Sequence, residues 1–270
     1  MKTELKIAWR YLFSKKQFNA IHIITAISSA AVGVVTAAMI CVLSVMNGFG
    51  VLVEQMFSQF DPDLRITAQT GKSFSISEEK RGELLDLPSV NLLSESITET
   101  ALVYFEDKQM PVQLMGVDSC FAALTEIEQI ITDGHYEVYD GAFDRAVLGQ
   151  GLAWKLGIGA RFVRGIEVYA PKREGKVNML RPDVNFNRET CFISGTFAVN
   201  QQKYDENMML VDINLTRRLL DYSANEVSAL QIGLVEGYRT KNAKREISSV
   251  LGEGYLLQDR YEQRPYDQDR

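Results

Sequence analysis

The chain has 270 residues, 46% of them hydrophobic and 24% charged, so it is long enough for one or two globular domains with a buried core. Its net charge of −6 is unevenly distributed, because residues 1–53 carry about +4 and the remainder about −10. A nucleic-acid-binding domain needs a basic face, so the acidic balance of the larger part argues against nucleic acid as a partner.

Three cysteines and two histidines are spread along the chain without any C-x-x-C pair, which argues against a zinc site. Cys41 lies in an apolar run, so only Cys120 and Cys191 are candidates for a disulfide in an oxidising compartment. Two separate buried thiols are the favoured interpretation. A disulfide requires the two thiols to lie close together in the fold, and sequence spacing does not determine that distance.

Residues 1–18 predict a short amphipathic helix, or elbow, on the cytoplasmic side of a membrane. Apolar residues recur at helical spacing, and Lys2, Lys6 and Arg10 take the other side. The apolar residues are Leu5, Ala8, Trp9, Leu12 and Phe13. Such a helix lies in the interface, with its cations near anionic headgroups. The alternative is a basic segment before the span, without a separate helix.

Residues 19–53 predict a transmembrane helix that continues into a stalk. No Asp, Glu, Lys or Arg occurs from Gln17 to Val53. Since about 20 helical residues cross a bilayer core, we expect the span to run from about Ile24 to Val45. A cleaved signal peptide is the main alternative, but its apolar core has only about 7–15 residues, and the end of this run is a poor cleavage site.

Charges and small residues predict how this helix is oriented and packed. Five Lys or Arg residues precede the span and none follows it before Arg65, which places the N-terminus in the cytoplasm and the large domain outside, in the periplasm of a Gram-negative cell. Within the span, Ser29, Gly33 and Ala37 recur every four residues. Small side chains on one stripe let helices approach closely in lipid, so this face is expected to pack against other helices.

Residues 54–258 alternate short strands with helices and predict a mixed α+β domain of two subdomains. We expect strands over 64–68, 101–105, 111–117, 145–148, 162–170, 190–199, 208–211, 227–234 and 255–257. Helices are expected over 77–87, 152–156, 214–220 and 238–251. A further helix is expected to run through Phe121, Leu124, Ile127 and Ile131. A polar tail, 259–270, ends the sequence.

The motifs of common enzyme classes are incomplete in this sequence. Gly71-Lys72-Ser73 lacks the preceding glycine of a phosphate-binding loop, and Gly149-x-Gly151 lacks the third glycine of a dinucleotide fingerprint. His135 lies near two carboxylates, but a solvated loop is the favoured interpretation. We therefore expect no catalytic site, no metal and no bound cofactor in this chain.

The run Leu43-Ser44-Val45-Met46-Asn47-Gly48-Phe49 closely resembles the end of the first span in lipoprotein-releasing (Lol-type) ABC-transporter permeases. These belong to a wider group in which the first and second spans bracket a periplasmic core domain, shared with macrolide-exporter and cell-division permeases. Residues 8–12 resemble the elbow of that group, and 114–118, 147–153, 156–159, 193–197 and 209–212 resemble strand and turn segments of its outer domain.

The resemblance implies an inner-membrane permease subunit that extracts lipoproteins and passes them to a periplasmic carrier. A separate cytoplasmic ATPase would bind and hydrolyse ATP, and a second copy or a paralogue would complete the permease pair. The resemblance further implies that Val42, Leu43, Met46 and Phe49 line the lipid-binding cavity at the outer end of the span. Plain lipid contact or helix packing is the alternative for each of these residues.

The polar insert between Pro171 and Arg188 resembles a protruding hairpin that captures the carrier in the lipoprotein-releasing branch. It is basic within an acidic domain and contains apolar residues, a combination that suits a partner site. The residues expected to bind the carrier are Lys172, Arg173, Lys176, Met179, Leu180, Arg181 and Pro182. An ordinary long loop is the alternative.

Two other functions remain open. The domain is also compatible with a permease that transmits ATP use to a cell-wall hydrolase, as in the cell-division type, or with a single-pass receptor. Permeases of the group carry three further spans after the outer domain, whereas this sequence reaches Arg270 without another apolar stretch. We therefore expect a truncated product or a fragment.

Overall fold

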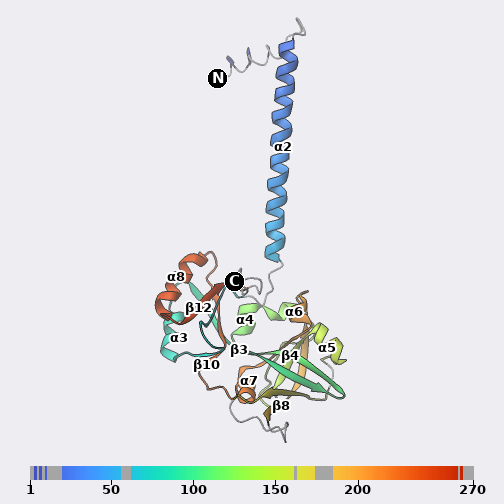
Figure 1. Ribbon diagram of the computed structural model, residues 1–270, viewed down its shortest axis with the longest axis vertical. Coiled ribbons are helices and arrows are strands. Elements are labelled where there is room, and N and C mark those ends of the chain that lie inside the picture. The colour runs from blue at the N-terminus through green and yellow to red at the C-terminus, as the bar shows by residue number, and fades with distance from the viewer. Residues whose placement is uncertain are drawn as a thin grey trace. The chain divides into compact units, whose positions relative to one another are not determined.

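A computed structural model of the chain describes residues 3–4, 6–7, 10, 20–55, 62–160, 163–173, 185–260 and 262–263. The chain divides into two compact units, Met1–Met56 and Phe57–Arg270. Figure 1 shows the helix of the first unit and the mixed α/β structure of the second.

The first unit is dominated by helix α2 (Ala20–Gln55), which has 36 residues and no charged side chain between its first residue and Val53. Its segment Ile23–Phe49 has a mean hydropathy of 2.2 and is long enough to cross a bilayer. The side chains of this segment are exposed on all faces. An apolar helix in that state needs lipid or other helices around it, so the prediction of one N-terminal apolar helix is confirmed. Of the predicted elbow, only residues 3–4, 6–7 and 10 are described, and they are helical.

The second unit is built on one ten-stranded sheet, in which nine strands follow the order β12-β1-β11-β3-β4-β9-β6-β8-β5 and β7 pairs with β3 and β8 off this path. Strand β3 (Val90–Phe105) has 16 residues and belongs to two lobes. Its first half pairs with β11 (Ala229–Leu234), and its second half pairs with β4 (Lys108–Val117) through a tight turn at Glu106 and Asp107. The sequence predicted only the end of β3, because its first half lacks a regular apolar alternation.

The larger lobe, here called the barrel lobe, is a ring of six strands. Strand β7 (Ile166–Pro171) pairs with both β3 and β8 (Phe186–Phe197), which closes the path β3-β4-β9-β6-β8-β7. The remaining strands of the ring are β6 (Arg145–Gly149) and β9 (Met208–Asp212). Helices α5 (Gln150–Leu156) and α7 (Ile213–Leu220) add Leu152, Leu156, Leu215 and Leu219 to its core. Because the ring of strands is closed, few strand edges in it remain unpaired.

Strand β9 shows why the central strands of the ring contain continuous apolar runs. Met209 and Val211 point into the ring, whereas Met208 and Leu210 belong to a second core on its outside. Successive side chains point to opposite faces of a strand, so both faces of β9 are buried. The outer core is covered by α4 (Phe121–Thr125), the 3₁₀ helix η1 (Ile127–Ile130) and α6 (Gln202–Asp205).

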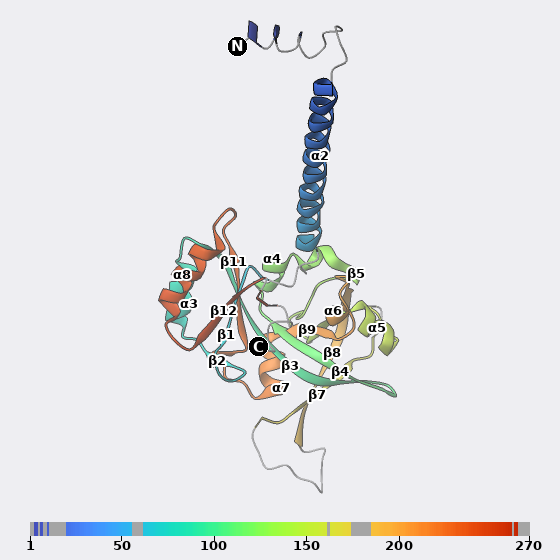
Figure 2. The same cartoon turned by 45° about the horizontal axis from the view of Figure 1, so that its top comes forward.

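The smaller lobe, here called the entry lobe, contains the first strand after α2. Strands β12 (Tyr255–Asp259), β1 (Leu64–Ala68), β11 and the first half of β3 form its sheet, and helices α3 (Glu78–Leu85) and α8 (Thr240–Leu251) cover one face. Figure 2 shows this pair of helices on one side of the second unit and α5 on the other. A two-stranded ribbon, β2 (Phe74–Ser75) with β10 (Glu226–Val227), lies outside the main sheet. The predicted mixed α/β fold is confirmed.

The predicted helix through Ile127 and Ile131 is wrong. Glu126 has a left-handed backbone with φ of 50°, which ends α4 after five residues. Ile131 then begins strand β5 (Ile131–Gly134), which pairs with β8. Apolar residues at helical spacing predicted the helix. In the folded domain, however, the end of this apolar segment pairs with β8 and is a strand.

The Gly149-x-Gly151 turn serves close packing and not cofactor binding. A Cβ at Gly149 would lie 2.6 Å from the carbonyl oxygen of Tyr204, and one at Gly151 would lie 3.0 Å from that of Asp205. The start of α5 therefore packs directly against the backbone of α6. A larger residue at Gly149 or Gly151 would prevent this close contact.

We expect Gly149→Ala to lower the free energy of unfolding by about 3 kcal/mol, the upper end for overpacking, because the clash is with backbone atoms that do not move aside easily. Chemical denaturation of the purified chain measures this change. The matched control is Gly82→Ala in α3, where nothing lies within 4 Å of the added Cβ. There the helix gains about 0.5–1 kcal/mol. Equal stability of the two variants would contradict the packing explanation.

Candidate functional site

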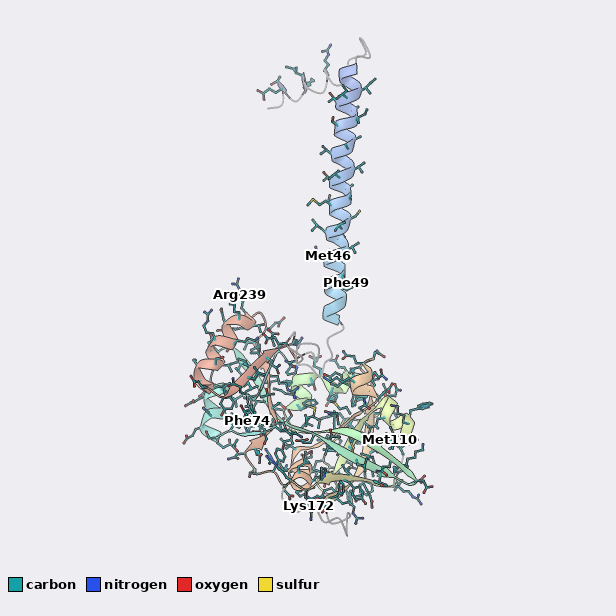
Figure 3. All side chains as sticks on the ribbon, in the orientation of Figure 1. Met46, Phe49, Phe74, Met110, Lys172 and Arg239 are labelled. Carbon is teal, nitrogen blue, oxygen red and sulfur yellow. The ribbon has the colours of Figure 1, made fainter. Side chains whose placement is uncertain are left out.

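The residues expected to line a lipid cavity share one face of α2. At about 100° per residue, Val42, Met46 and Phe49 fall within about 60° of one another, and Leu43 lies beside them. Each of these four side chains is well exposed, with Met46 at 62%. Figure 3 labels Met46 and Phe49 on this helix. The helix therefore presents a continuous apolar stripe that the described part of the chain leaves uncovered.

The small-residue stripe lies on the opposite face of α2. By the same helical geometry, Ser29, Gly33 and Ala37 are centred about 180° away from the stripe of Val42, Met46 and Phe49. A Cβ at Gly33 would meet nothing within 4 Å, so this face has room for another helix. The two predicted roles are therefore compatible, since one face is suited to helix packing and the other to contact with flexible apolar chains.

The predicted insert is the connection between the two arms of a β-hairpin. Strands β7 and β8 are antiparallel, and their register continues to Pro171 opposite Phe186. The Lys172 backbone N–H then donates to the Asn185 carbonyl oxygen at 2.9 Å. Lys172 is exposed, and Figure 3 labels it. The other predicted contact residues, apart from Arg173, lie outside the described residues: Lys176, Met179, Leu180, Arg181 and Pro182.

Arg173 is engaged by groups far away in the sequence. Its guanidinium is 2.6 Å from the Glu226 carboxylate, donates to the Ser73 hydroxyl at 2.9 Å and lies 4.4 Å from the centre of the Tyr222 ring. Sequence reasoning missed Ser73, Tyr222 and Glu226. No local pattern marks these residues, because only the tertiary fold brings them to the insert.

Lys172 and Arg173 border a hollow of about 380 Å³ at the base of the hairpin. Lys72 lies on its rim and pairs with Glu99 at 3.1 Å, and Leu220 and Tyr222 form its apolar part. Mixed cationic and apolar surface of this kind suits contact with a protein partner.

The described residues contain no group of three or more His, Cys, Asp or Glu side chains placed to hold a metal ion. His135 and Glu137 form an exposed pair 3.2 Å apart. Cys191 is buried and Cys120 is partly buried, and both are free thiols. Burial raises the pKa of the Cys191 thiol, which disfavours the reactive thiolate.

The model of one protein family, the MacB-like periplasmic core domain, matches residues 25–250. The periplasmic region of MacB from Actinobacillus actinomycetemcomitans is similar in structure, with a TM-score of 0.55 and 7% identity over 75% of this chain and 91% of that one. The extracellular domain of the noncanonic ABC-type transporter YknZ from Gram-positive bacteria is also similar, with a TM-score of 0.51 and 13% identity over 73% of this chain and 99% of that one. At these identities the likeness shows the fold alone. None of the curated proteins matches the sequence.

Proposed function

Because the chain belongs to the family of MacB-like periplasmic core domains, we propose that it serves an ABC transporter that extracts lipoproteins from the inner membrane and passes them to a periplasmic carrier. Membership of this family of ABC-transporter permease domains implies a partner ATPase. The chain combines one apolar helix with such a domain, as a membrane protein with an extracytoplasmic domain does. On our proposal the N-terminus is cytoplasmic, and a second permease copy or paralogue completes the path.

The physical problem of lipoprotein release is the cost of removing acyl chains from the bilayer. Each CH₂ group taken out of the apolar phase costs about 0.8 kcal/mol, so a long chain needs an external energy source and an apolar shelter. The proposed ATPase supplies the energy. The stripe of Val42, Leu43, Met46 and Phe49 would contribute to the shelter, and Met adapts well to flexible chains.

The observation that carries the proposal is the β7–β8 hairpin. Among the described residues its arms are paired as far as Lys172 and Asn185, and residues 174–184 connect the two arms. Residues 172–184 carry four cations, Lys172, Arg173, Lys176 and Arg181, against the two carboxylates of Glu174 and Asp183. The unit that carries this connection is acidic overall. A basic segment with apolar residues suits capture of a partner that has an acidic rim and an apolar site, as a carrier of acylated proteins needs.

We expect replacement of residues 176–183 by a Gly-Ser linker of equal length to abolish carrier binding in a pull-down with the full chain. The linker keeps the hairpin arms closed while removing the cations and apolar side chains. The matched control is the double variant Arg239→Ser, Lys241→Ser. It removes two exposed cations from the entry lobe, where Figure 3 labels Arg239, and should bind the carrier normally.

Retention of carrier binding by the linker variant would refute the hairpin as the capture site. Co-purification of the wild-type chain with a cell-wall hydrolase in place of a lipoprotein carrier would refute lipoprotein release and favour the signalling type of permease.

A further inference from the structure

The base of the hairpin is connected to the entry lobe by side chains as well as by the sheet. Arg173 directly follows Lys172, whose backbone N–H is bonded to Asn185 of the β8 arm. Ser73 directly precedes β2, and Glu226 belongs to β10, so two of the groups that bind Arg173 lie on the β2–β10 ribbon. The third, Tyr222, follows the end of α7 in the barrel lobe.

The arrangement around Arg173 is a built site and not a chance surface pair. Glu226 is only 14% exposed, and its Oε1 accepts hydrogen bonds from both Arg173 and Ser73. Tyr222 lies against the guanidinium, which favours a planar cation that stacks and binds in two directions. Burial raises the pKa of Glu226, but hydrogen bonds from Ser73, Arg173 and the Ser223 backbone outweigh it and hold the pKa below its usual value. Glu226 is therefore charged at neutral pH.

The neighbouring cation behaves differently. Lys172 is exposed and borders the same hollow as Arg173 and Tyr222, but its side chain forms no hydrogen bond or ion pair with another described residue. The Arg173 side chain is 43% exposed, but its guanidinium is held by Glu226, Ser73 and Tyr222. Lys172 therefore suits contact with a partner, whereas Arg173 suits a positioning role.

We infer that Arg173 is a positioning residue, which clamps the base of the β7–β8 hairpin to the β2–β10 ribbon and thereby sets the direction in which the hairpin meets its partner. This inference rests on the proposed function for the identity of the partner, a lipoprotein carrier. The clamp links the hairpin to the lobe whose strand β1 follows the membrane helix in the chain.

The clamp raises carrier affinity by raising the fraction of molecules whose hairpin has the orientation that binds the carrier. If only a fraction of molecules holds the hairpin in the competent direction, the apparent affinity falls by that fraction. With the clamp removed, the hairpin samples several directions, and we expect carrier affinity to fall about tenfold. The contact residues themselves are unchanged by such a variant.

The test uses the full chain with Cys41→Ser and Cys120→Ser, and nitroxide labels at Phe186→Cys on the hairpin arm and Glu79→Cys on α3. Pulsed electron resonance measures the distribution of distances between the labels, and carrier affinity is measured on the same variants. Arg173→Ala and Glu226→Ala should each broaden the distribution and weaken carrier binding about tenfold. The exchanged pair Arg173→Glu, Glu226→Arg, which restores the ion pair but not the contact with Tyr222, should restore both in part.

Two variants separate positioning from contact and from folding defects. Lys172→Ser should weaken carrier binding without broadening the distribution. Ser73→Ala, which removes one hydrogen bond of the clamp, should give an intermediate broadening even if a larger change unfolds the entry lobe.

An unchanged distance distribution in Arg173→Ala, or failure of the exchanged pair to restore it, would overturn the clamp. A broadened distribution with full carrier affinity would overturn its role in capture. If the wild-type chain does not bind a lipoprotein carrier while the distributions respond as expected, the clamp stands and the proposed function is what fails.

Discussion

Glu95→Ala is expected to lower the free energy of unfolding of the second unit by about 3 kcal/mol. It leaves the largely buried Arg217 without its carboxylate partner, and it leaves Arg81 with only the exposed Glu78 at 4.0 Å. Glu95 lies in the middle of β3, where the strand passes from one lobe to the other. One carboxylate oxygen is 3.0 Å from Arg81 on α3 of the entry lobe, and the other is 3.0 Å from Arg217 on α7 of the barrel lobe. The single carboxylate therefore bridges the two lobes.

The size of the effect follows from burial. The side chains of Glu95 and Arg217 are 11% and 16% exposed, so solvent screens their interaction only weakly. The matched control is Glu78→Ala. Glu78 is the other partner of Arg81, at 4.0 Å, but its side chain is 78% exposed, and such pairs contribute little. Urea denaturation followed by circular dichroism measures both variants. A loss below 1 kcal/mol for Glu95→Ala would show that the lobes do not depend on this bridge.

On the proposed function, the second large effect is expected from Met46→Glu in the assembled transporter. A carboxylate in an apolar lipid site costs roughly 3 kcal/mol, which corresponds to about a hundredfold loss of binding. Lipoproteins should therefore remain in the inner membrane, as membrane fractionation measures. The reason lies in the position of Met46 between Val42 and Phe49 on the exposed face of α2 that is opposite the small-residue stripe.

Met46→Leu is the matched control, because it keeps the volume and the apolar character of the side chain and should release lipoproteins normally. Co-purification of the ATPase with the Met46→Glu variant shows that the complex still assembles. Normal release by an assembled Met46→Glu transporter would contradict the assignment of this face to the lipid cavity.

Local patterns in the sequence were sufficient for most helices and strands. The helix predicted over 77–87 begins at Glu78, and the side chain of the preceding Ser77 accepts from the Lys80 backbone N–H at 3.3 Å. The helix predicted over 152–156 ends before Gly157, whose φ of 77° is typical of a residue that stops a helix. Such features depend on residues within one turn of each other. The short ribbon strands β2 and β10 were missed or merged with a neighbour, since two-residue strands have no periodicity to detect.

For the candidate site, the sequence identified the insert and the apolar stripe but not what supports them. The prediction for Lys172 as a contact residue stays a prediction, and its exposure is compatible with it. Arg173 was grouped with Lys172 because the two are adjacent cations in a basic segment. Their different surroundings depend on Glu226, which is 53 positions further along the numbering of the chain and meets Arg173 only in the folded domain.

By itself, the sequence determined the features that depend on the residues within a short segment of the chain. An uncharged run of this length makes a helix suited to lipid, and alternating or helical apolar spacing defines the local elements. What only the tertiary structure decided is which elements meet: the closure of β7 onto β3, the transfer of Ile131 to a strand, and the clamp on Arg173. These pairings join residues far apart in the chain, and their free energy comes from burial and hydrogen bonds that exist only after the chain has folded.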